Sequence, residues 1–187
     1  MPLSPPAARR PIHKRQIEVN GYQRDDGLWD IEGRVLDTKS YRFEEHERVV
    51  PAGDAQHDLW LRLTLIGDGT IRAAEASTDA APFTMCGDIA PAFGQLVGLN
   101  IGKGFQRAVR EKLGGSRGCT HLVELLVPMA TVAFQTMGLG PDPDRRQSGM
   151  KVYDPDQGGP HLGGCHTFAF HSETVRRHYP KFFREKG

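Results

Sequence analysis

The spacing of apolar residues changes along this chain, and that change limits the possible folds more than any other feature. Apolar and polar residues alternate through HKRQIEVNGY and WDIEGRVLDTKSY, and again through LWLRLTL and TIRAAEAST. Alternation with a period of two is typical of strands that have one buried face. Turn residues separate the members of each pair, Arg24 to Gly27 in the first and Gly67 to Gly69 in the second. The first half of the chain is therefore predicted to form two β-hairpins.

Beyond Pro82 the apolar residues recur at three- and four-residue intervals, which predicts helices. One helix should end near Gly98, a short amphipathic helix should cover FQRAVREKL, and a third should run from Thr120 to Met137 with a wide apolar face. The segment SETVRRHYPKFF predicts a short closing helix that ends at Pro180. We expect an α+β fold in which a mainly antiparallel sheet packs against about three helices. The domain organisation that follows is a flexible arm at 1–12, an α+β domain at 13–137 and a loop-rich extension at 138–187.

Composition excludes several classes of protein. A formal charge of +1 gives no general attraction to nucleic acid. No apolar run approaches the roughly 20 residues that cross a bilayer, so we expect no membrane insertion. The three cysteines are far apart and odd in number, which favours a reducing compartment, and we expect a cytoplasmic protein. Sheet edges and an apolar helix face make a homodimer a reasonable assembly.

Side chains that bind metals stand near the predicted ends of several elements. His57 and Asp58 precede a strand, Cys86 lies between a strand and a helix, and Cys119 and His121 stand at the start of the third predicted helix. Thiolate, imidazole and carboxylate together suit zinc or iron. If these element ends converge, the five residues form a metal site, and Glu124 would orient one of the ligands from outside. The alternative for Cys119 is a small hydrophobic residue packed in the core.

A second group of chemically active side chains lies on the first predicted hairpin. Asp30 and Glu32 share one face of their strand, and Asp37 and Lys39 follow. Two close carboxylates push their pKa values apart and can act as acid and base. The same alternation also describes a solvated sheet face, and that alternative stays open.

The segment from Asp58 to Phe134 resembles the core of the U-type iron-sulfur cluster assembly scaffold, with Asp58, Cys86 and Cys119 at positions that match its ligands and Glu124 five residues beyond the last cysteine. The chain departs from the scaffold at two ligand positions. Gln56 stands where the scaffold has its first cysteine, and His57 is next to it. Gly118 stands where the scaffold has its histidine, and His121 is nearby. The resemblance implies a metal site, and these departures favour a single metal ion over a transient cluster.

The whole chain, through GYQRDDGLWDIEGRVLDTKSY, HDLWLRLTL, TDAAPFTMC, GCTHLVELL and HYPKFF, also resembles a bacterial domain-of-unknown-function family. This second resemblance implies catabolism of aromatic or acyl compounds.

Three hypotheses about function follow. The first is a metal-dependent enzyme, a lyase or hydrolase, that acts on a small aromatic or acyl molecule through the proposed site. The second is a non-enzymatic carrier of metal or an iron-sulfur cluster. The third is a cofactor-free enzyme that uses Asp30, Glu32 or Lys39 for acid-base chemistry.

Overall fold

The structure is a computed structural model that describes residues 3–102, 104–137, 155–156, 158–159 and 161–186. The chain divides into two compact units, residues 1–138 and 139–187, and each is described by itself.

The first unit is built on a four-stranded antiparallel sheet, as the alternation predicts. Its strands follow the order β1-β2-β5-β6, so each predicted hairpin forms one half and β2 pairs with β5 in the middle. A small hairpin of β3 and β4 lies between β2 and β5 in the chain. The strands are β1 (His13–Gln23), β2 (Trp29–Lys39), β3 (Phe43–Glu44), β4 (Val49–Val50), β5 (Ala55–Leu65) and β6 (Ile71–Ala80).

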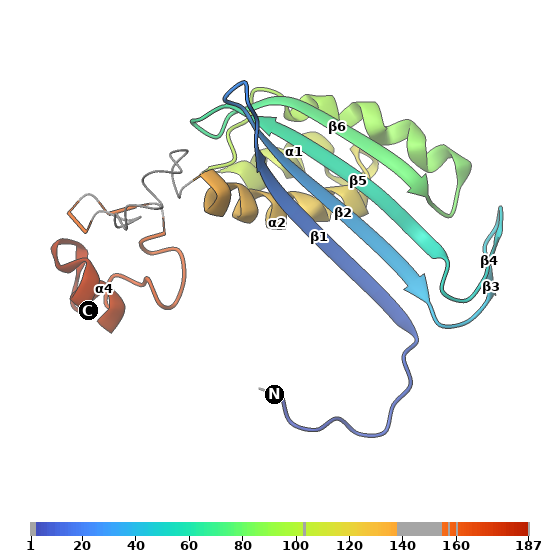
Figure 1. Cartoon of the computed structure of the whole chain (residues 1–187), viewed down its shortest axis with the longest axis horizontal. Coiled ribbons are helices and arrows are strands. Elements are labelled where there is room, and N and C mark those ends of the chain that lie inside the picture. Colours follow the sequence, from blue (N-terminus) through green and yellow to red (C-terminus); the bar gives the residue numbers. More distant parts are fainter. Residues whose placement is uncertain (1–2, 103, 138–154, 157, 160, 187) are drawn as a thin grey trace. The chain divides into compact units, whose positions relative to one another are not determined.

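Helices cover one face of this sheet (Figure 1). The first predicted helix is η1, a 3-10 helix rather than an α-helix, and it contains Pro91, which lacks the N–H that an α-helix requires. The third predicted helix is confirmed as the longest of those described. The helical elements of this unit are η1 (Thr84–Leu96), α1 (Phe105–Leu113), η2 (Gly115–Arg117) and α2 (Thr120–Met137). The expected α+β architecture is therefore confirmed.

The core lies between the sheet and these helices. Along β2 every second residue is buried, from Trp29 to Asp37. Helix α2 buries Leu122, Leu125 and other apolar side chains against this face. Gly33 of β2 permits close approach of the helix, since a Cβ there would lie 2.8 Å from the Met129 sulfur. The start of α2 is thus held over the sheet, where the polar residues at its first turn can meet the ends of the strands.

The second unit contains a short helix, α4 (Glu173–His178), followed by η3 (Pro180–Phe182). The Ser172 hydroxyl accepts a hydrogen bond from the Val175 amide and caps α4, and Val175 is buried. The predicted closing helix is thereby confirmed, whereas most of the loop expected before it lies outside the described residues. In the described part of the chain, no helix is both long and apolar enough to cross a membrane.

Candidate metal centre

Three polar residues lie side by side across the helix-covered face of the sheet, near the end of β2. The register pairs Asp37 of β2 with Arg15 of β1 on one side and with His57 of β5 on the other. Directly opposed residues of antiparallel strands project from the same face, so the three side chains meet. We call Arg15, Asp37 and His57 the cross-strand row.

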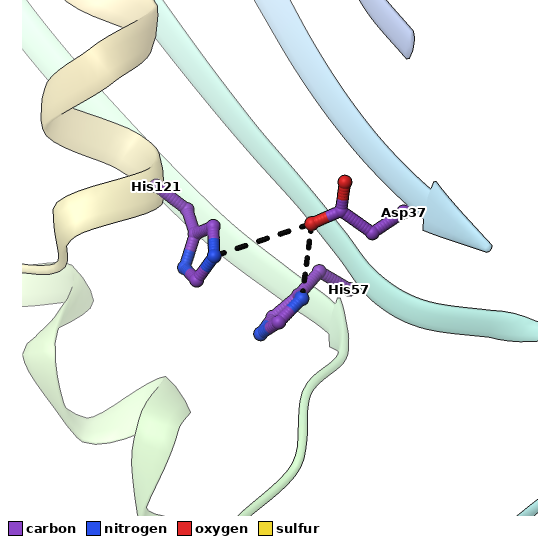
Figure 2. A group of neighbouring side chains, drawn as sticks. All are labelled: Asp37, His57 and His121. Atoms are coloured by element: carbon purple, nitrogen blue, oxygen red, sulfur yellow. Dashed lines mark hydrogen bonds and ion pairs between the residues drawn. The ribbon is translucent and has the colours of Figure 1, made fainter. Parts of the chain in front are cut away.

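Helix α2 places a second imidazole over this row. His121 lies in the first turn of the helix, and its ring centroid is 4.0 Å from that of His57. Figure 2 shows both rings directed at the same carboxylate: Asp37 Oδ2 is 3.1 Å from His57 Nδ1 and 4.0 Å from His121 Nε2. Each of the three residues offers one ligand atom within 4.8 Å of the other two. Two imidazoles and a carboxylate are a ligand set that zinc and iron accept.

Asp37 is the centre of this arrangement and is only 1% exposed. Arg15 donates to both of its oxygens, from Nε at 2.8 Å and from Nη2 at 2.7 Å. Arg15 also donates to Glu124 of α2 at 2.8 Å, and His13 Nε2 lies 3.4 Å from Asp37 Oδ1. Burial by itself would raise the pKa of Asp37, but the Arg15 hydrogen bonds and charge outweigh it and lower that pKa. Asp37 is therefore ionised at neutral pH, and its charge is balanced by Arg15.

Both imidazoles are held in the neutral form. Burial lowers the pKa of His57, and the neighbouring His121 lowers it further. Burial also lowers the pKa of His121, with a contribution from the Arg15 charge. A metal ligand must be a neutral imidazole, so these shifts favour coordination at pH 7. Because an ionised carboxylate only accepts hydrogen bonds, His57 Nδ1 donates to Asp37. Coordination of a metal ion by Nδ1 would require the other neutral tautomer, with the proton on Nε2.

Cys119 stands immediately before α2, and its sulfur is 4.0 Å from His121 Nδ1. Its carbonyl accepts from the Val123 amide, which puts Cys119 at the position that caps the helix. The side chain also packs against the core cluster, so the predicted thiol at a helix start and the alternative of core packing are both realised. Cys119 is adjacent to the group of Asp37, His57 and His121 but is not a member of it.

The structure brings together some of the residues singled out in the sequence and separates others. His57 and His121 meet, and Glu124 contacts the group through Arg15. Asp58 points to the opposite face of the sheet, because it follows His57 in the same strand. There its carboxylate accepts two hydrogen bonds from Arg34, at 2.7 and 2.6 Å. A ligand role for Asp58 alongside His57 therefore has no support in this geometry.

Cys86 lies in η1 and is partly buried. It does not join the group of Asp37, His57 and His121. The expected pair of thiols at one site is thus not formed in this structure.

Two of the predicted acid-base residues, Asp30 and Glu32, lie on the face of the sheet opposite the row. Asp30 accepts a hydrogen bond from Thr64 at 2.7 Å and Glu32 accepts one from Arg62 at 2.7 Å, both on the face of the sheet that α2 does not cover. The Lys39 ammonium lies 4.1 Å from the centre of the Phe43 ring. Asp30, Glu32 and Lys39 thus each have a partner of their own in the structure, and none of them belongs to the group of Asp37, His57 and His121.

Sequence reasoning named Asp37 only as a neighbour of Lys39 and did not single out Arg15. Asp37 could have been recognised from the alternation in β2, because it falls on the same side of the strand as the buried residues Ile31 and Val35. A carboxylate at a buried position needs a charged or hydrogen-bonding partner. That requirement could have marked Asp37, whereas its pairing with Arg15 depends on strand register.

Comparison with known proteins gives a family. Neither the curated proteins nor the solved structures contain a match to this chain. A family profile does match it, over residues 13–135, which include the sheet, the row and nearly all of α2. The chain therefore belongs to the family described as "Protein of unknown function (DUF2889)".

Proposed function

We propose that this protein is a metal-dependent enzyme that binds one divalent metal ion, zinc or iron, through Asp37, His57 and His121. The observation that carries the proposal is the convergence of three ligand atoms, from β2, β5 and the first turn of α2, within 4.8 Å of one another. Ligands that come from separate elements of a packed core are held in place by the fold, as a metal centre requires.

The Arg15 guanidinium is compatible with a metal at this position. A carboxylate offers about four lone-pair sites on its two oxygens, so Asp37 can accept from Arg15 and still bind a cation. Arg15 fixes the carboxylate from β1, while the two imidazoles approach from β5 and α2. Hydrogen-bonded partners of this kind orient ligands and are typical of metal centres.

Three protein ligands would leave a coordination position for water or substrate, which distinguishes a catalytic zinc site from a closed structural one. A metal ion in that setting polarises a carbonyl oxygen and activates water. The chemistry that fits is a hydrolase or lyase reaction on a small molecule, and the resemblance described above points to an aromatic or acyl compound. His13, 43% exposed, lies beside Asp37 at the solvent side of the site.

Metal content tests this proposal. Protein purified without a metal-affinity tag should contain about one zinc or iron ion per chain by elemental analysis. His57→Ala and His121→Ala should each weaken binding by more than the ~10–100-fold that loss of an outer partner costs. His46→Ala is the matched control, because His46 stacks on Phe83 and is exposed. Binding that survives both ligand variants would overturn the assignment.

A second candidate function is a metal carrier, and the position of Cys119 is the observation that favours it. A carrier would use the Cys119 sulfur, which lies 4.0 Å from His121 Nδ1, as a fourth ligand. Cobalt-loaded protein distinguishes the two functions, since a thiolate ligand produces a charge-transfer band that Cys119→Ser abolishes. The carrier is favoured if the unsubstituted protein shows the band, Cys119→Ser lacks it, and the unsubstituted protein transfers its metal rapidly to an acceptor protein. A site without the band would favour the enzyme.

A further inference from the structure

His57 follows an irregularity in its strand. Asp37 pairs with His57, but the next residue of β2, Thr38, pairs with Ala55, so Gln56 is an extra residue in β5. Such a β-bulge changes the direction of the strand and re-aims the side chains beside it. The direction of the His57 ring at the metal centre therefore depends on how the bulge is held.

Arg48 holds the bulge directly. Its Nη2 donates to the carbonyl of Ala55 at 2.9 Å and to the carbonyl of Gln56 at 2.8 Å. A bulge interrupts the ladder of strand hydrogen bonds, so its backbone groups need other partners. A single guanidinium group thus fixes the two peptide carbonyls that immediately precede His57.

The side chain of the bulged residue is fixed as well. Gln56 Nε2 donates to Glu45 Oε1 at 2.8 Å, and Arg48 Nε donates to the other oxygen of Glu45 at 3.4 Å. The side chain of Glu45 is 10% exposed, so this carboxylate is well shielded from water. Arg48, Glu45 and Gln56 form a closed set of hydrogen bonds, which we call the bulge clamp.

The hairpin of β3 and β4 that carries the clamp is itself anchored at both ends. Val50 of β4 is buried. At the turn, Glu47 accepts from the backbone amide of Thr84 at 2.6 Å and from its hydroxyl at 2.9 Å. The clamp therefore connects His57 to η1 through a short, well-supported segment.

We propose that Arg48 is a positioning residue that sets the direction of His57 at the metal centre by clamping the bulge, with Glu45 as its support. The inference rests on the proposed metal site but names a residue outside it. Arg48 is not a member of the ligand group and acts through the backbone of β5. Arginine suits this task because its planar fork donates several hydrogen bonds in a fixed geometry, which lysine cannot reproduce.

Cobalt titration of Arg48→Met tests the proposal. Loss of a partner that orients a metal ligand weakens affinity by about 10–100-fold, and we expect a change of that size. The ligand-field spectrum of the bound cobalt should also change, because it reports the arrangement of ligands around the ion. Arg48→Lys should recover only part of the affinity and of the spectrum.

Arg62→Met is the matched control. Arg62 lies in the same strand and makes two carboxylate contacts, with Glu32 at 2.7 Å and Glu75 at 3.1 Å, on the face that α2 does not cover. Its replacement should leave the cobalt affinity and spectrum as in the unsubstituted protein. An equal loss in both variants would show a general stability effect and would overturn the positioning role.

The two proposals fail differently. If the unsubstituted protein binds no cobalt, the metal centre is wrong and the role of Arg48 falls with it. If it binds cobalt and Arg48→Met binds with the same affinity and spectrum, the metal centre stands and the positioning role is refuted. Should Arg48→Met not fold, Glu45→Gln replaces it under the same criteria, since it keeps the side-chain shape and removes the charge that supports Arg48.

Discussion

Replacement of Asp37 by asparagine removes the charge at the centre of the cross-strand row. The Asp37 side chain is 1% exposed and accepts two hydrogen bonds from the Arg15 guanidinium. An asparagine side chain would keep the shape and one acceptor oxygen, but its NH₂ group would face donors. The substitution therefore breaks the ion pair without creating a cavity.

The expected loss follows from these contacts. Hydrogen bonds to charged groups contribute about 1.5–3 kcal/mol each, which sets an upper limit of about 6 kcal/mol for the pair. Arg15 limits the damage, because it is 33% exposed and keeps its bond to Glu124. We expect Asp37→Asn to lower the free energy of unfolding by about 2–4 kcal/mol. The corresponding fall in Tm is about 5–15 °C for a chain of this length.

Urea unfolding in the presence of a chelator measures this effect without a contribution from bound metal. Asp58→Asn is the matched control, since Asp58 also accepts two hydrogen bonds from one arginine, Arg34. That pair lies on the uncovered face, with side-chain exposures of 14% and 32%. The Asp58 carboxylate is more exposed than that of Asp37, so its replacement should cost less stability.

The pH dependence gives an independent check. The pKa of Asp37 is lower in the folded protein, so its stabilising effect is fully present above the unfolded value of about 3.9 and is lost as the pH falls through the folded pKa. The difference between the unsubstituted protein and Asp37→Asn should shrink in that acidic range. Equal losses for the Asp37 and Asp58 variants, or a difference that does not shrink in acid, would refute the assignment of Asp37 as a buried structural charge.

Two further predictions concern the imidazoles and the packing of α2. Folding lowers the pKa values of His57 and His121. Below about pH 6.5, the pKa of an imidazole in the unfolded chain, the unfolded protein therefore binds more protons than the folded one. The free energy of unfolding should decline as the pH falls below that value. Urea unfolding at several pH values measures this decline. If a variant with both His57→Gln and His121→Gln shows the same dependence of unfolding free energy on pH, the prediction is wrong. Gly33→Ala should lower the unfolding free energy by about 1–3 kcal/mol, because its Cβ would lie 2.8 Å from the Met129 sulfur. Gly67→Ala is the control, because a Cβ at Gly67 would meet nothing within 4 Å. Equal melting temperatures of the two variants would refute the packing argument.

The fold followed largely from local patterns. Alternating apolar residues around Val35 and Leu61 identified strands β2 and β5, and the turn signal at Gly27 separated β1 from β2. The apolar spacing from Leu122 to Ala133 identified the helix that covers them. Each pattern reflects one element with one buried face, so neighbouring residues in the chain were enough to recognise it.

The candidate site followed only in part. His57 and His121 were singled out because imidazoles near element ends can bind metals, and they meet in the fold. Asp58 was predicted as a ligand because it stands beside His57 before a strand and matches a ligand position of the scaffold, whereas Asp37 was considered only among the acid-base residues. Neighbours in a strand point to opposite faces, so the residue next to His57 in sequence is the one turned away from it.

The sequence by itself determined the types of element, their order, and the supply of imidazole, thiol and carboxylate groups. Tertiary structure decided which of them meet. Pairing of β1 and β5 on either side of β2 set Arg15, Asp37 and His57 in one row, and the docking of α2 added His121. Strand register and helix docking depend on packing between residues that are 20 or more positions apart in the chain, as Asp37 and His57 are, so no local pattern could have specified them.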